Sequence, residues 1–150
     1  MTQPEPTQLC TFQLGPYACA LDIRYVREVI RPRLPTPVPR APLGVVGLVS
    51  LRGQILTAFD LGPSLGLEPR VEAPYAIVVE LGDDMVCLLT DEVGEVGDAD
   101  PSCLEPPPAN LKPELRNVVE RAYRTPDNLF LVLNPRAVID VTCSPIATCD

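Results

Sequence analysis

The sequence predicts an all-β fold built from a duplicated unit of about five strands. Short apolar runs rich in β-branched residues alternate with glycine and proline turns along most of the chain. The start of the second half resembles the start of the first at a constant offset of 67 positions. In each half a proline-rich connection follows the third expected strand, and proline excludes both a central strand and a helix interior there.

Five strands are expected in the first half, at 9–14, 17–21, 26–30, 45–51 and 54–60. Gly15-Pro16 provides the first turn, and Arg52-Gly53 provides the last. The five prolines between residues 32 and 42 indicate an extended connection. The apolar spacing of 45–51 also permits a helix, but its glycines and valines favour a strand. One short helical turn is expected over 61–67.

The second half begins the same pattern again. Its expected strands are 75–81, 85–90, 93–96 and, later, 129–134. Leu81-Gly82 falls on Leu14-Gly15 at the offset of 67, and 93–96 falls on 26–29. A repeated unit of this kind closes most economically as a small barrel, because closure removes exposed sheet edges.

The length of 150 residues suits one domain with a hydrophobic core of its own. Within it we expect one subdomain at about 9–70 and a second at about 75–140, with strands open to exchange between them. Tails are expected at 1–8 and 141–150. Apolar residues make up 46% of the sequence, yet no apolar run is long and uncharged enough to span a bilayer. The start lacks the pattern of a secretory signal, which favours the cytoplasm.

Charge is distributed unevenly along the chain. The net charge of −8 disfavours general nucleic-acid binding. Residues 22–53 contain six arginines and two acids, whereas residues 68–105 contain eleven acids and one arginine. These segments are either two solvated faces or surfaces for two different partners.

The residues that most catalytic and metal sites need are missing from this sequence. It has no histidine and no Cys-x-x-Cys, which argues against a zinc site and against Ser-His or Cys-His nucleophiles. It also has no glycine-rich phosphate loop. Asp91-Glu92 is better explained as a hairpin end than as a general acid-base pair. We therefore expect no enzyme activity, no metal and no cofactor, and a protein that works through its surfaces.

The six cysteines fall into two groups. Cys10, Cys19 and Cys87 lie inside apolar strands and are expected in the core. The other three, Cys103, Cys143 and Cys149, lie in a loop or the tail, and the sequence leaves open whether any of them pair.

A single cation, Arg52, interrupts the long apolar stretch of residues 44–61. Burying a charge between Leu51 and Ile55 is costly unless the charge is paired. Arg52 is therefore expected at a turn between two strands, with Glu28 as its candidate carboxylate partner.

Several short motifs follow one another along residues 9–140: Val-Arg-Glu-Val-Ile at 26–30, Pro-Arg-Ala-Pro at 39–42, Gly-Leu-Val-Ser-Leu-Arg-Gly at 47–53, Asp-Leu at 60–61 and Asp-Glu-Val-Gly-Glu-Val at 91–96. In this order the motifs resemble those of the CheW family, the adaptors of bacterial chemosensory arrays. The resemblance implies two intertwined five-stranded SH3-like barrels. It also implies a non-catalytic adaptor that bridges the cytoplasmic tip of a methyl-accepting chemoreceptor to the regulatory domain of a CheA-type histidine kinase. The implied location is the cytoplasm, at membrane-associated receptor arrays, without insertion into the membrane.

The resemblance also assigns site residues. The positions that match the family's receptor-facing groove are Val26, Glu28, Arg52, Val93 and Val96, and the position that matches its kinase-facing barrel is Gly47. Each has a structural alternative: the valines can be core residues, Arg52 can be a turn residue with a local ion pair, and Gly47 can mark a bulge or a tight bend.

Three features depart from the family pattern. Ser50 stands where Asn commonly precedes Leu-Arg-Gly, the 32–42 link is unusually rich in proline, and the end from Cys143 to Asp150 lacks a helical pattern. Two other classes of function remain open, a structural SH3-like interaction module and a small-ligand sensor. The first usually needs clustered aromatic residues, and this chain has no tryptophan and only seven Phe and Tyr residues.

Overall fold

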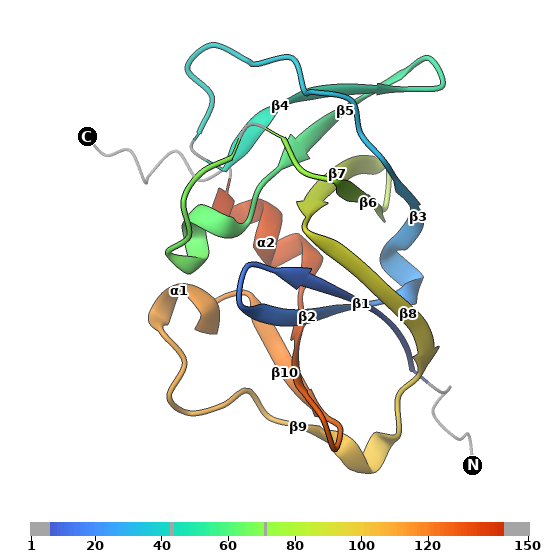
Figure 1. The fold of residues 1–150 in the computed structure, drawn as a ribbon, viewed down its shortest axis with the longest axis vertical. Helices are drawn as coiled ribbons and strands as arrows, with labels where there is room; N and C mark the ends of the chain where they lie inside the picture. Colours follow the sequence, from blue (N-terminus) through green and yellow to red (C-terminus); the bar gives the residue numbers. More distant parts are fainter. Residues whose placement is uncertain (1–6, 43, 71, 143–150) are drawn as a thin grey trace.

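Each of the two sheets combines strands from both halves of the chain (Figure 1). The computed structural model describes residues 7–42, 44–70 and 72–142. Its strands are β1 (Gln8–Leu14), β2 (Tyr17–Asp22), β3 (Val26–Ile30), β4 (Val45–Leu51), β5 (Gln54–Phe59), β6 (Tyr75–Leu81), β7 (Asp84–Thr90), β8 (Glu92–Asp98), β9 (Leu104–Glu105), β10 (Val119–Arg124) and β11 (Leu129–Leu133). The first sheet has the order β8-β1-β2-β11-β10-β9, and the second has the order β3-β6-β7-β5-β4. The all-β prediction is confirmed.

The pairing register repeats between the halves. Phe12 of β1 lies opposite Val93 of β8, and 67 positions later Val79 of β6 lies opposite Val26 of β3. The last two strands of each half repeat at an offset of 74. Val45 pairs with Phe59, and Val119 pairs with Leu133. The residue after each of these hairpins is also equivalent, because the N–H of Asp60 donates to Gly44 O and the N–H of Asn134 donates to Val118 O.

The third strand of each half pairs with the first hairpin of the other half. β3 pairs with β6, and β8 pairs with β1. Each sheet therefore takes its first hairpin from one half and its remaining strands from the other. The boundary expected at about 70–75 does not separate the two sheets, because it falls between β5 and β6 of the second sheet.

The connection between β3 and β4 lies along the outer edge of β4. Thr36 and Leu48 exchange two backbone hydrogen bonds, of 2.9 and 2.8 Å. The segment that leaves one edge of the second sheet thus returns to pair with the other edge. This arrangement curls the sheet toward the expected barrel and leaves less of its edge unpaired.

Short elements of the second half were not expected from the sequence. They are the helices α1 (Pro113–Arg116) and α2 (Pro135–Thr142) and the strands β9 and β10. The strand β10 reads Val-Glu-Arg-Ala-Tyr-Arg and has too few apolar residues to stand out. α2 does have a start signal, because Asn134 Oδ1 accepts the N–H groups of Arg136 and Ala137.

The described residues also include three single-turn 3-10 helices, η1 (Ile23–Tyr25), η2 (Gly62–Leu65) and η3 (Pro101–Cys103). The turn η2 lies within the helical turn expected at 61–67. The expected tails need correction, because β1 already includes residue 8 and α2 includes residues 141–142. The expected non-helical end at 143–150, with Cys143 and Cys149, lies outside the described residues.

A large apolar core fills the space between the sheets, and smaller clusters cover their other faces. Cys10, Cys19 and Cys87 are fully buried, as predicted. Burial raises the pKa of Cys19 to about 12 and that of Cys87 to about 11, so both thiols stay protonated and unreactive at neutral pH. Within the described ranges, no helix is long and apolar enough to cross a membrane.

Candidate functional site

The turn between β4 and β5 holds Arg52 in a backbone conformation that arginine rarely adopts. Its φ is 50° and that of Gly53 is 82°, between strands that stay paired up to Leu51 and Gln54. Positive φ at both central residues is the requirement of a type I′ hairpin, in which Asn-Gly is the favoured sequence. A residue with a Cβ is strained at the first of these positions. The turn itself therefore does not account for an arginine here.

The side chain of Arg52 reaches Glu28 on the opposite edge of the second sheet. Nη1 and Nη2 each donate to one carboxylate oxygen, at 2.7 Å, so the pair is bidentate. The hydrogen bonds from Arg52 hold the pKa of Glu28 below its ordinary value, and those to Glu28 raise the pKa of Arg52. The pairing expected from the sequence is present. The side chain of Arg52 is nevertheless 71% exposed, which leaves its guanidinium open to a partner.

Matching bulges in β3 and β8 determine which way their valines point. Val93 and Val96 lie opposite Phe12 and Cys10, and one extra residue of β8 lies between these pairs. Residues three apart alternate faces in a regular strand, but the bulge brings both valines to the face of the main core. Gly94 permits this, because a Cβ there would overlap Thr11 Oγ1.

The same bulge in β3 gives Val26 a companion that was not expected. Val26 lies opposite Val79 and Val29 lies opposite Ile77, so both point to the core face. Val29 is 40% exposed and Val96, its counterpart in β8, is 52% exposed. The repeat could have identified Val29, because it aligns with Val96 at the offset of 67.

These four valines, Val26, Val29, Val93 and Val96, form what we call the valine edges. They lie on β3 and β8, which are edge strands of the two sheets and are both on the right of Figure 1. Val26 and Val93 are half-buried and pack against the main core, so the structural alternative holds for part of their surface. Val29 and Val96 are the exposed members.

Gly47, the expected kinase-facing residue, is buried on β4. A Cβ at this position would overlap the carbonyl oxygen of Thr36 and lie 3.2 Å from Cβ of Pro35. Glycine is therefore required because the proline-rich connection crosses β4 directly over it. The structural alternative of a bulge is present, because the register of β4 against β5 shifts between Val45 and Gly47.

A second ion-pair network, not expected from the sequence, surrounds Arg70. Its Nη1 donates to Asp91 Oδ1 at 2.6 Å, and its backbone N–H donates to Asp60 Oδ2 at 3.3 Å. Asp91 Oδ2 also accepts the N–H of Gly15 at 2.6 Å. Asp91 directly follows the hairpin of β6 and β7, whose last pair is Tyr75 with Thr90, so it stands at a hairpin end as interpreted from the sequence. The available signal was that Arg70 is the single cation among the eleven acids of 68–105.

The carboxylates of this network differ in environment. Asp60 is 1% exposed, and burial raises its pKa above the ordinary value. The hydrogen bond from Arg70 lowers the pKa of Asp91, which is more exposed. One guanidinium therefore compensates a buried charge and a half-buried charge at once. In the part of the chain that the structure describes, no group of three or more Cys, Asp and Glu side chains is placed to hold a metal ion.

Comparisons with known proteins agree on one family. The family model described as CheW-like domain matches residues 8–143. The chemotaxis protein CheW of Rhizobium meliloti is 32% identical over 104 residues, which cover 67% of this chain and 66%, just under two thirds, of that protein. The chemotaxis protein CheW of Treponema pallidum is 30% identical over 98 residues, covering 61% of this chain and 58% of that protein. The crystal structure of scaffolding protein TtCheW from Thermoanaerobacter tengcongensis is similar with a TM-score of 0.75 and 28% identity, covering 86% of this chain and 89% of that one.

Proposed function

The chain belongs to the CheW family, and from this we propose that it couples chemoreceptors to a histidine kinase as a non-catalytic adaptor. Members of the family are scaffolding proteins of chemotaxis. The proposed partners are the cytoplasmic tip of a methyl-accepting chemoreceptor and the regulatory domain of a CheA-type kinase. The proposed location is the cytoplasm, at receptor arrays on the membrane. One observation carries the proposal: Arg52, held in strained backbone and mostly exposed, reaches across the second sheet to Glu28 on β3, the edge strand that also carries the exposed Val29.

We propose that the receptor binds along the valine edges. An amphipathic receptor helix would cover Val29 and Val96, whose exposed apolar surface is otherwise unfavourable in water. Arg52 would share its guanidinium between Glu28 and a receptor side chain, since the planar group offers more donors than the two that Glu28 uses. Glu28 would then act as a positioning residue that directs Arg52 toward the receptor.

We propose that the kinase binds the first half near the proline-rich connection. Leu34 and Val38 of this connection are 64% and 36% exposed and lie among the arginines of the basic segment 22–53. Gly47 is buried beneath the connection, so its proposed role is indirect. It would allow the connection to keep the shape that the kinase recognises.

The receptor role of Arg52 is tested by Arg52→Ala in a pull-down with purified receptor tips. We expect weaker capture with unchanged melting, because the side chain is mostly exposed. Arg124→Ala is a matched control, since Arg124 forms a similar exposed pair with Glu105 away from β3 and β8. Unchanged capture by Arg52→Ala would remove Arg52 from the receptor surface, and lost capture by both variants would indicate a general charge effect.

A double-mutant cycle tests whether Glu28 acts through Arg52. Glu28→Arg alone places two cations together and should weaken receptor capture. Adding Arg52→Glu restores an opposite pair in reversed order, so part of the stability should return. Losses that simply add would count against direct coupling. If stability recovers while capture does not, the cation itself is what the receptor recognises.

A further inference from the structure

The repeat creates two equivalent seams between the sheets, and they differ in what occupies them. The filled seam comprises Gly15, Asp60, Leu67, Arg70 and Asp91. The open seam comprises the equivalent residues of the other half, with Gly82 at the place of Gly15, Arg24 at that of Asp91 and Asn134 at that of Asp60. The first two equivalences follow the offset of 67. The third follows the offset of 74 that the strand register establishes.

The filled seam is occupied by the chain's own connection between η2 and β6. A Cβ on Gly15 would lie 2.8 Å from Cδ1 of Leu67, so this leucine covers the turn between β1 and β2. Three residues later Arg70 places its guanidinium between Asp60 and Asp91, and its side chain is only 20% exposed. The occupant is thus an apolar side chain followed, three positions on, by a charged one.

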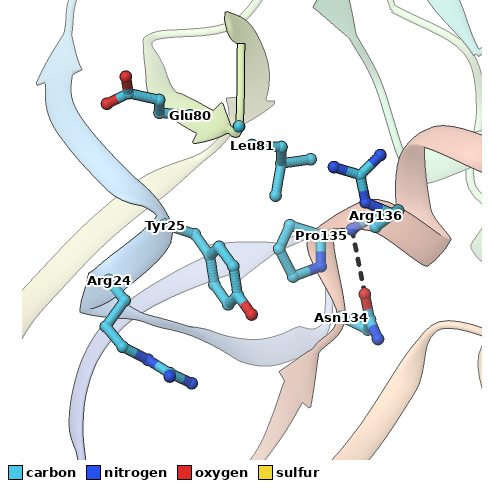
Figure 2. Close-up of a pocket in the computed structure, with 8 residues that line it drawn as sticks. Arg24, Tyr25, Glu80, Leu81, Asn134, Pro135 and Arg136 are labelled. Carbon is cyan, nitrogen blue, oxygen red and sulfur yellow. Dashed lines mark hydrogen bonds between the residues drawn. The ribbon is translucent and has the colours of Figure 1, made fainter. Parts of the chain in front are cut away.

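The open seam lacks such an occupant among the described residues. No atom of the described residues lies within 4 Å of a Cβ built on Gly82, although the φ of Gly82, 62°, is close to the 54° of Gly15. A hollow of about 520 Å³ is present instead. Its lining residues are Arg24, Tyr25, Glu80, Leu81, Gly82, Asn134, Pro135 and Arg136. Figure 2 shows Tyr25, Leu81 and Pro135 facing one another, with the guanidinium groups of Arg24 and Arg136 on opposite sides.

The charge of the open seam is inverted relative to the filled one. Arg24 stands where Asp91 stands, so an anion is replaced by a cation. Arg24 already donates to Asp22 Oδ2 from Nε at 3.1 Å and from Nη2 at 2.9 Å, which compensates part of its charge, but its side chain is 72% exposed and keeps further donors for a second carboxylate. Asn134 stands where Asp60 stands, so its amide offers a donor where a carboxylate only accepts. Arg136 adds a second cation to the rim, and the carboxylate of Glu80 is paired with Arg27 at 3.4 Å. An arginine like Arg70 would be repelled here, whereas a carboxylate would be attracted.

We propose that the open seam is a docking site for a partner protein, which inserts an apolar side chain against Gly82 and Tyr25 and an acidic side chain, three residues later, between Arg24 and Asn134. The filled seam is the template for the spacing, and the inverted charges select the acid. Tyr25 and the arginines are residue types that often carry interface energy. None of the residues that line this docking site belongs to the valine edges or to the connection over Gly47, although Tyr25 directly precedes Val26.

The test uses two peptides copied from the filled seam and the full isotope-labelled chain. One peptide is residues 62–70 with Arg70 replaced by Glu, and its control is the same segment with Arg70 kept. Followed by NMR amide shifts, the acidic peptide should perturb Gly82, Tyr25 and Arg136 saturably. The arginine peptide should bind at least about fivefold more weakly, the size expected of one exposed charge pair.

A reversal variant sharpens the test. Arg24→Asp combined with Asn134→Asp rebuilds the acids of the filled seam and should prefer the arginine peptide. Aspartate also caps helices well, so α2 should keep its start. If this variant does not fold, Arg136→Glu alone should weaken the acidic peptide by about fivefold. Equal binding of both peptides, shifts elsewhere, or no saturable shift up to about 10 mM, where a millimolar Kd is visible, would each overturn the proposal.

Discussion

The two halves of the chain share their core pairing and differ at the end of one hairpin. In the first half the turn is Arg52-Gly53, and Arg52 pairs with Glu28. In the second half the equivalent turn is Pro126-Asp127, because the N–H of Thr125 donates to Asn128 O just as the register predicts. Glu95 takes the place of Glu28 and has no ion pair among the described residues.

This difference shows that the two halves of a repeat can share the same strand pairing and still present different surfaces. The bulges of β3 and β8 occur at equivalent positions, and so do those of β4 and β10. Divergence is concentrated in the turns, in the seam connections and in the residues that point outward. The interior fixes the backbone, because each inward position must fill its place in a close-packed core. The exteriors were free to acquire opposite charges.

The largest effect should come from Arg70→Met, which removes the guanidinium between Asp60 and Asp91 from the filled seam. Asp60 is almost fully buried and would lose its compensating cation. We expect the free energy of unfolding to fall by about 3 kcal/mol. Urea unfolding measures this loss. Arg136→Met in the open seam is the control, and its free energy of unfolding should differ from that of the unchanged protein by no more than the experimental error. An equal loss in both variants would mean that the two seams do not differ as described.

The same variant predicts a pH dependence. Arg70 lowers the pKa of Asp91, so the stability contributed by Asp91 is complete above its ordinary pKa of about 4 and is lost as pH falls through the lower folded value. Asp60 has a raised pKa, so its buried charge costs stability above about pH 4, and Arg70 limits that cost. The deficit of Arg70→Met should therefore be largest near pH 7 and shrink below about pH 4. A deficit that does not change with pH would assign the loss to packing.

A smaller effect is expected from Gly47→Ala. The added methyl group overlaps the carbonyl of Thr36, so the connection must shift away from β4. We expect a loss of about 2 kcal/mol by thermal or urea unfolding. Gly97→Ala is a matched control, because a Cβ there has no neighbour within 4 Å in the part of the chain that the structure describes. In the second half the equivalent position is occupied by Arg121. If Gly47→Ala does not change the free energy of unfolding, the first half tolerates a side chain at this position as the second half does.

Replacing Asn134 by alanine should cost about 1 kcal/mol, since the side chain caps α2. Asn134→Asp should leave stability nearly unchanged, because Asp60 caps Gly62 in the same way in the first half. Circular dichroism during urea unfolding distinguishes the two variants. If the alanine and aspartate variants have the same stability, the cap does not contribute to stability. Asn134 and Asp60 would then occupy equivalent positions without sharing a capping role.

The smallest effect on stability is expected from Arg52→Asn. Asparagine suits the first position of a type I′ turn, so relief of backbone strain should offset the lost pair with Glu28. The midpoint of unfolding should stay where it is, while receptor capture falls. A large drop in the midpoint would show that Arg52 is mainly structural, which would make the two hairpin ends equivalent in role.

Much of the fold was accessible from sequence because the strands of the first half are short, β-branched and separated by glycine or proline. The pair of Arg52 with Glu28 was accessible for a different reason: an unpaired charge in an apolar run needs a partner. The bulges were not accessible, because alternation alone places Val93 and Val96 on opposite faces. The partner of Asp91 was missed because an ion pair across 21 residues leaves no periodic signal.

The strand exchange has a consequence for how the chain assembles during synthesis. The second sheet uses only residues 26–90, so all of its strands are available once β7 has been made. The first sheet encloses that segment in sequence: β1 and β2 precede it, and their neighbours β8 and β11 follow it. The earliest hairpin must therefore wait, with both edges unpaired, until residues beyond 92 emerge. The second sheet can therefore form first. The first sheet forms later, because it joins the most distant parts of the chain, and pairing of such distant segments is the slow step expected of this topology.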